Sequence, residues 1–257
     1  MKRALLGTVA LLVLSAAAFG QAPKGLTSTK VGEKPTLDGK LDEKLWEVAS
    51  TAEFKVAMVR MADLAAGNFA PAAARDAKLY VANDDDNLYI GLVLKGDDYD
   101  AEFDPNTGRV RVDMLVTQFD TDNNLAASVG DDQKLLISVN NGTFVDQYRV
   151  KLQGPDEHVD DPDRAGHTGP DGAGAMVHST RAGIGDYTIE MSIPLSSGDK
   201  NDFSAKPGGQ VNMTMIFADG FNMQNAMNDM LLGVVAGPTI ESMFSGGSSY
   251  IPLTLAE

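Results

Sequence analysis

Apolar and polar residues alternate along most of this chain, and the alternation is clearest in residues 78–95. Leu79, Val81, Leu88, Ile90 and Leu92 recur at every second position, which is typical of strands with one buried face. A polar stretch at 84–87 separates the two apolar runs, and its Asp and Asn residues favour a turn. The segment is therefore predicted to be a β-hairpin.

The same two-residue period recurs along the chain and predicts an all-β protein. Asn140, Asn141 and Gly142 mark a second hairpin, because Asn and Gly accept the positive φ angles of a tight turn. A short helix is expected after Asp42, which can cap it, with Trp46 turned towards the core. Further strands are expected at 26–31, 54–58, 110–119, 135–139, 144–152, 176–180, 187–193, 211–217, 233–242 and 248–255.

One long acidic segment interrupts this pattern. Residues 155–175 contain six Asp or Glu, three Pro and four Gly, with almost no apolar residue, so an exposed loop is expected. A domain boundary would be the alternative. We favour a loop within a single domain, because the strands after it need the earlier strands to complete a core.

The first 20 residues have the pattern of a secretory signal. Lys2 and Arg3 precede an apolar run at 4–18, and small residues precede a plausible cleavage point before Gln21. Residues 21–34 are expected to form an extended leader and 35–257 the domain. The run is short for a membrane span and no other segment is as apolar, so no transmembrane segment is expected after cleavage. The sequence thus predicts a secreted or periplasmic protein, monomeric by default.

Charge and cysteine content exclude several classes of function. The 21 basic and 36 acidic residues give a net charge of −15, and without Lys2 and Arg3 the balance of 19 against 36 is −17. A nucleic-acid partner is therefore excluded. The chain has no cysteine, which removes disulfides, thiolate metal sites, c-type haem attachment and cysteine nucleophiles. The acidity serves either solubility or calcium binding.

Spacing points to two candidate calcium sites. Asp120, Asp122 and Asn124 have the one-three-five spacing of oxygen ligands in a calcium loop. An EF-hand is excluded, because Leu125 stands at the position where an EF-hand loop needs Gly. The calcium hypothesis is therefore a site formed by loops of a β scaffold. The alternative is that these residues only close turns. The second candidate is the acidic turn formed by Asp84, Asp85 and Asp86, whose mutual repulsion a cation would relieve.

No pattern supports catalysis. The chain has no nucleophile elbow and no phosphate-binding loop, and pairs of carboxylates mean little among 36 acids. His158, His167 and His178 lack metal-ligand spacing and are expected to be solvated. We therefore expect a protein that is not an enzyme.

Several motifs resemble the carbohydrate-binding module family 9-like domains. They are the run from Leu37 to Trp46, the stretch Asn87-Leu88-Tyr89-Ile90 followed by Asp97-Asp98, the pair Phe119-Asp120, and the segment 187–195 with its Glu190-x-x-Ile193-Pro194 pattern. The resemblance covers about residues 36–253. It implies an antiparallel, jelly-roll-like β-sandwich, often secreted, commonly calcium-stabilised, and binding glycans in some members.

Sugar binding would use aromatic rings that stack on the sugar. Trp46 lies in the opening motif, where burial is expected, so the candidate ligand-binding residues are Tyr99, Phe103 and Phe221. Each of them could equally close the end of the sandwich. The first functional hypothesis is an exported, non-catalytic module that binds carbohydrate.

A related branch of the family, similar to the haem-binding subunit of ethylbenzene dehydrogenase, holds haem b on the same scaffold. Met58, Met61 and a late Met cluster are the candidate axial ligands, although such clusters usually form adaptable core. The alternatives to sugar binding are therefore a haem b electron-transfer module or a structural protein of the envelope. The late cluster comprises Met213, Met215, Met223, Met227, Met230 and Met243.

Overall fold

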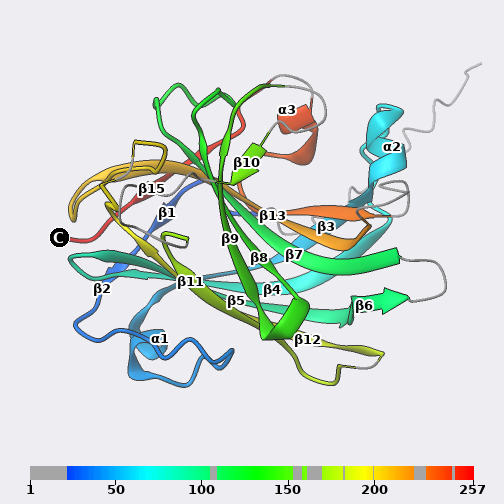
Figure 1. Ribbon diagram of the computed structural model, residues 1–257, viewed down its shortest axis with the longest axis horizontal. Helices are drawn as coiled ribbons and strands as arrows, with labels where there is room; N and C mark the ends of the chain where they lie inside the picture. The colour runs from blue at the N-terminus through cyan, green and yellow to red at the C-terminus, as the bar shows by residue number, and fades with distance from the viewer. Residues whose placement is uncertain are drawn as a thin grey trace, which may run out of the picture.

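The computed structural model describes residues 22–104, 109–152, 158–160, 170–181, 183–198, 200–222, 230–244 and 247–257. The predicted signal at 1–20 and most of the acidic loop lie outside these residues. Within them the chain is a single all-β domain with few short helices (Figure 1). No described helix has the length and apolar character needed to cross a membrane.

The described strands form one sheet. Its main path runs β10-β9-β8-β7-β13-β14-β3-β4-β5-β12-β11, and neighbours on this path are antiparallel. The strands are β1 (Leu26–Thr27), β2 (Thr29–Lys30), β3 (Ser50–Arg60), β4 (Ala73–Asn83), β5 (Asn87–Asp98), β6 (Ala101–Asp104), β7 (Arg109–Asp120), β8 (Asp132–Ile137), β9 (Thr143–Arg149), β10 (His158–Asp160), β11 (Ala173–His178), β12 (Ile184–Pro194), β13 (Gln210–Asn222), β14 (Leu231–Ala236) and β15 (Ile251–Thr254).

The sheet curls so strongly that its two ends face each other as the layers of a sandwich. A Cβ added to Gly174 on β11 would lie 3.0 Å from the δ carbons of Leu136 on β8, although the two strands are far apart in strand order. Gly142, after the helix η1 (Val139–Asn141), likewise approaches the backbone of Met176. The predicted antiparallel sandwich is therefore confirmed, in the form of a half-barrel.

The main core fills the space inside this curl. Leu79, Leu88, Ile90 and Leu92, the alternating residues of the predicted hairpin, are fully buried in it. The hairpin is confirmed as β4 paired with β5. Its other face is not solvated as expected, because the segment before β3 lies across it and buries Tyr89 as well.

This covering segment carries the helix α1 (Lys44–Val48), which places Trp46 and Leu45 against Tyr89. Trp46 is 3% exposed, as predicted from its position. The residue at the helix N-cap is Glu43 rather than the expected Asp42, and it makes no side-chain capping bond. Burial of Trp46, not capping, therefore holds this short helix in place.

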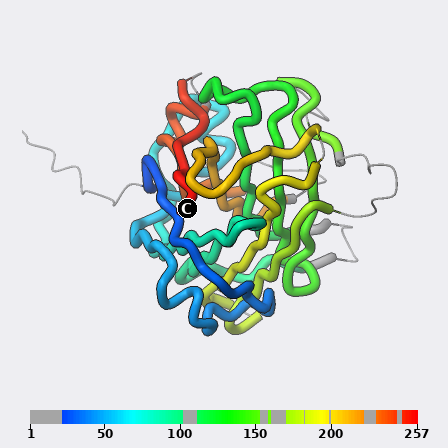
Figure 2. The backbone as a smooth tube through the Cα atoms, turned by 90° about the vertical axis from the view of Figure 1, so that its left-hand side faces the viewer, coloured from blue at the N-terminus to red at the C-terminus, as the bar shows by residue number. Residues whose placement is uncertain are grey.

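The first described residues and the C-terminal residues lie side by side. β1 pairs with β15 in parallel and β2 pairs with β4 in parallel, so the expected leader contributes two short strands to the sheet. Figure 2 shows the blue N-terminal segment running beside the red C-terminal one. These two pairs lie off the main path of the sheet, on which neighbouring strands are antiparallel.

Other expectations need correction. The strand expected at 233–242 ends at Ala236 and is followed by the helix α3 (Ile240–Phe244). The helix α2 (Met61–Ala65), which follows β3, has no counterpart among the expected elements. The segment 155–175 is not wholly a loop, because β10 and the start of β11 fall in it. The hairpin at 140–142 is confirmed, with positive φ angles at Asn140, Asn141 and Gly142.

Candidate functional site

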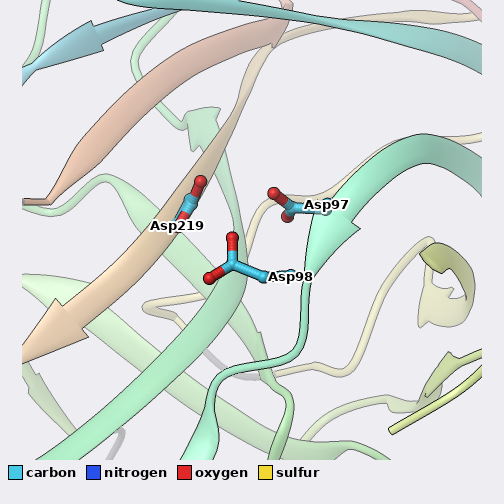
Figure 3. Close-up of side chains that lie close together, drawn as sticks. All are labelled: Asp97, Asp98 and Asp219. Atoms are coloured by element: carbon cyan, nitrogen blue, oxygen red, sulfur yellow. The ribbon is translucent and has the colours of Figure 1, made fainter. Parts of the chain in front are cut away.

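Carboxylates converge at the end of the sandwich where β5 and β13 approach each other. Asp97 and Asp98 end β5, and Asp219 comes from a bulge where the register of β13 against β7 shifts. Oxygens of the three side chains lie within 4.8 Å of one another. Figure 3 shows the three carboxylates around a common space. Bulges often re-aim side chains at functional sites. We call these three residues the Asp97 cluster.

Arg75 on β4 supplies the nearest positive charge. Its Nε donates a 3.0 Å hydrogen bond to Oδ1 of Asp97, and its Nη2 lies 3.7 Å from Oδ2 of Asp219. Asp97 is fully buried and Asp219 is 5% exposed, whereas Asp98 faces solvent. One guanidinium thus faces three carboxylates.

The excess of carboxylates over basic groups affects the pKa values of Asp97 and Asp219. Burial, with added repulsion from Asp97 and Asp98, raises the pKa of Asp219 to about 7. Burial also raises the pKa of Asp97, although Arg75 opposes this. At neutral pH the Asp97 cluster therefore retains a proton or needs a cation.

Asp113 on β7 lies deeper at the same end and ties its elements together. It accepts hydrogen bonds from the Tyr187 hydroxyl and, at 2.9 Å each, from the backbone N–H groups of Asp100 and Gly220. Burial raises the pKa of Asp113 to about 8. A side chain at Gly220 would meet Arg111, and its φ of 68° also favours glycine. The bulge that presents Asp219 therefore depends on this glycine.

The three aromatic residues predicted for ligand binding come to this end of the sandwich. Tyr99, directly after the Asp97 cluster, is half-buried, with its ring centre 5.4 Å from His178 and 6.5 Å from Tyr187. Phe221 is half-buried on β13 opposite Val112. The backbone of Phe103 lies on β6, and its side chain is outside the described part of the chain. Their role in binding stays a prediction.

The expectation of solvated histidines is wrong for His178. It is 3% exposed at the end of β11, and its Nε2 lies 3.1 Å from the carbonyl oxygen of Asp97. Its Nδ1 accepts the backbone N–H of Arg181 at 3.1 Å, so Nε2 carries the proton. His158 is half-buried on β10, and His167 lies outside the described residues. His178 thus braces the strand end that carries Asp97.

The predicted metal residues of the acidic turn are held by protein donors. Oδ1 of Asp84 accepts the backbone N–H groups of Asp86 and Asn87 at 2.8 and 2.6 Å, and its Oδ2 accepts the Tyr89 hydroxyl at 2.6 Å. Asp85 pairs with Lys30. The geometry is that of a closed turn, and calcium binding there remains a prediction.

The other predicted metal loop does gather its acids. Oxygens of Asp120, Asp122 and Asp131 lie within 4.8 Å of one another, with Asn124 beside them. Oδ2 of Asp120 accepts the Leu125 backbone N–H at 2.8 Å, and its Oδ1 accepts that of Asn124 at 3.2 Å. Asp131, which is not among the residues predicted from the spacing, completes this group.

A fourth acidic group was missed altogether. Lys134 on β8 is 1% exposed, and its Nζ lies 3.1 Å from Asp132 and 2.5 Å from both Asp146 and Asp202. Burial raises the pKa of Asp132 to about 8 and that of Asp146 to about 6. The expected strand began at residue 135, and a lysine in an apolar pattern gives no sign that it is buried. The ammonium group of Lys134 therefore balances part of the negative charge of these three carboxylates.

The methionines proposed as haem ligands are core residues where they are described. Met58, Met213 and Met215 are fully buried in the main core, and Met230 belongs to a second cluster with Leu64. A haem ligated by Met58, Met213 or Met215 would require this packing to open. Met61 and Met243 are half-buried, and Met223 and Met227 lie outside the described residues.

No protein-family model matches the chain, and no curated protein matches it either. Solved structures do. A family 9 carbohydrate-binding module from Caldicellulosiruptor kristjanssonii, in complex with cellotriose, superposes with a TM-score of 0.51 at 12% identity, covering 91% of this chain and 94% of that one. The chain has the fold of the family 9 carbohydrate-binding modules.

Two further structures agree. The family 9 module of C. kristjanssonii in complex with glucose gives a TM-score of 0.51 at 11% identity, over 90% of this chain and 95% of that one. A candidate carbohydrate-binding protein from Bacteroides uniformis gives 0.52 at 12% identity, over 91% and 100%. The family 9 fold thus extends over about nine tenths of the chain.

Proposed function

We propose that this protein is an exported, non-catalytic module that binds carbohydrate. The observation that carries the proposal is the family 9 fold over about nine tenths of the chain, shared with modules solved in complex with glucose and cellotriose. The two predicted aromatic residues with described side chains, Tyr99 and Phe221, lie at the end where charged groups gather, which is consistent with sugar recognition.

The chemistry of this end suits a polyhydroxylated ligand. Arg111 is half exposed, with its Nη2 2.7 Å from Oδ2 of Asp100, and Asp98 faces solvent. Such groups hydrogen-bond sugar hydroxyls, while the Tyr99 ring offers a partly exposed apolar surface. Ala101 and Phe221 both lie opposite Val112, so these chain positions are two strand spacings apart, roughly 10 Å. A sugar of two or three rings can span that distance.

The test is calorimetry with glucose and cellotriose, preceded by a glycan array because the natural ligand is not fixed by this fold. We expect a Kd roughly between millimolar and micromolar, about −4 to −8 kcal/mol. Tyr99→Ala and Phe221→Ala should weaken binding at least tenfold while the thermal melt stays cooperative. Lys55→Ala, on an exposed pair with Asp76 far along β3, is the matched control. The proposal is contradicted if the protein binds no glycan on the array, or if all variants bind equally well.

Export and calcium stabilisation belong to the same proposal. Export rests on the pattern at 1–20, and N-terminal sequencing of protein recovered outside the cytoplasm should begin at Gln21. Calcium stabilisation at the loop rests on the convergence of Asp120 and Asp122 with Asp131. Asp122→Asn should abolish that part of any calcium-dependent rise in melting temperature.

A further inference from the structure

We propose that Asp97, Asp98 and Asp219 bind a divalent cation, calcium in preference to magnesium, at the end of the sandwich. The three carboxylates come from β5 and from the bulge of β13, and their oxygens lie within 4.8 Å of one another (Figure 3). None of these residues belongs to the loops that spacing had indicated. Asp98 also belongs to the end of the sandwich proposed for sugar binding, so cation binding is tested in the absence of sugar.

The observation that points to an ion is an oxygen of Asp97. Asp97 is fully buried, and its Oδ1 accepts the Nε–H of Arg75, but its Oδ2 has no hydrogen-bond donor within the described structure. This carboxylate faces those of Asp98 and Asp219 (Figure 3). A buried carboxylate oxygen without a partner destabilises the fold, and a bound cation would remove that cost.

Within the described residues, single oxygens of Asp100, Asp132 and Asp202 also lack a hydrogen bond, but each of these carboxylates pairs with a basic side chain of the protein, Arg111 or Lys134. Lys134 lies among Asp132, Asp146 and Asp202. Backbone N–H groups and the Tyr250 hydroxyl reach the oxygens of Asp120 and Asp131. The carboxylate of Asp113 accepts hydrogen bonds from the Tyr187 hydroxyl and from the backbone N–H groups of Asp100 and Gly220, and Arg111 pairs with the Asp100 side chain.

Charge and geometry fit calcium. The three carboxylates of the Asp97 cluster and the Arg75 guanidinium carry a net charge of −2, and oxygens of Asp100 and Asp113 also lie within 4.8 Å of one of Asp219, with Arg111 paired to Asp100, so the surroundings favour a cation. Two oxygens bound to one Ca²⁺ at about 2.4 Å are at most about 4.8 Å apart, and Mg²⁺ at about 2.0–2.1 Å needs a tighter octahedron. Exposed Asp98 leaves the cluster open on one side, so water can complete the larger coordination shell of calcium.

Arg75 is a positioning residue in this arrangement. By holding Oδ1 of Asp97 at 3.0 Å, it leaves Oδ2 as the oxygen available to an ion. His178 restrains the same strand end through the Asp97 carbonyl. Asp97 is therefore fixed before any ion arrives, which reduces the entropy cost of binding.

The experiment is titration of the chelator-treated protein with calcium alone and with magnesium alone, followed by calorimetry. We expect calcium to bind, and Asp98→Asn to weaken one binding event at least tenfold. Asp98 is exposed, so this isosteric change leaves folding intact; Asp219→Asn is the second variant. Asp76→Asn, an exposed aspartate paired with Lys55, is the matched control and should bind as the unmodified protein does.

Asp122→Asn separates the loop hypothesis from this one. If calcium binding is lost in Asp122→Asn and unchanged in Asp98→Asn, the loop is the site and the proposal is overturned. The absence of calcium binding at millimolar concentration, which would leave a shared proton between Asp97 and Asp219, overturns it as well. No sugar is present in the titration, so this failure is distinct from a failure of carbohydrate binding.

Discussion

The carboxylate of Glu190 accepts a hydrogen bond from the indole Nε1–H of Trp46 at 3.0 Å, across 144 residues of chain. Its second oxygen accepts the backbone N–H groups of Asp38, Gly39 and Lys40 at 3.1, 2.7 and 3.2 Å. Glu190 is fully buried, so these four donors replace water around it. The opening motif and the Glu-x-x-Ile-Pro motif of the sequence are therefore two halves of one contact.

This contact predicts a specific loss of stability. Glu190→Ala leaves three backbone donors and an indole N–H without their acceptor and should lower the free energy of unfolding by about 2–4 kcal/mol. Trp46→Phe, which removes one donor and some packing, should cost about 1–3 kcal/mol. Urea denaturation measures both. Val48→Ala, on the exposed face of the same helix, should change the value by less than about 0.5 kcal/mol, and an equal effect there would contradict the assignment.

Stability should fall as the pH rises from about 5 to 8 in the presence of chelator. Burial raises the pKa of Asp113 and Asp132 to about 8 and of Glu190 and Asp219 to about 7, above the ordinary values near 4. A raised carboxyl pKa gives stability that is complete below the unfolded pKa and is lost as the pH passes the folded one. Denaturant midpoints at pH 5, 6, 7 and 8 measure this, and midpoints that rise over this range would refute it.

Calcium should reverse part of that loss. The proposed ion would bind the deprotonated Asp97 cluster, so its stabilising effect should be larger at pH 8 than at pH 5.5. At a hundredfold excess over its dissociation constant, bound calcium adds about 2.7 kcal/mol to the free energy of unfolding. Melting temperatures with calcium and with chelator at both pH values check this. Asp98→Asn should reduce the difference at pH 8, whereas Asp76→Asn should not.

Lys134 should be essential for stability, because it is buried among three carboxylates. Lys134→Met leaves Asp132, Asp146 and Asp202 together without their ammonium, which should cost about 3–5 kcal/mol. Lys55→Met removes one exposed pair with Asp76 and should cost less than about 1 kcal/mol. Equilibrium unfolding in urea compares the two. A Lys134→Met protein as stable as the Lys55→Met protein would show that the buried ion network contributes little.

Local pattern accounts for much of this fold. The alternation at 78–95 predicted β4 and β5, and the Asn-Asn-Gly turn at 140–142 predicted the hairpin of β8 and β9, because both depend on side-chain period and turn chemistry. The family motifs indicated a sandwich and a buried Trp46. The acidic spacing at Asp120 and Asp122 indicated a group that does converge.

Only the tertiary structure decided which acids meet at the candidate site. Asp97 ends β5 and Asp219 lies on β13, and β14, β3 and β4 stand between these strands in the sheet. The two carboxylates approach because the sheet curls and because β13 bulges at Gly220. Curl and bulge depend on the packing of many distant side chains, and neither leaves a period in the sequence. For the same reason the burial of Lys134 and His178, set by strands that fold over them, could not be predicted from the residues alone.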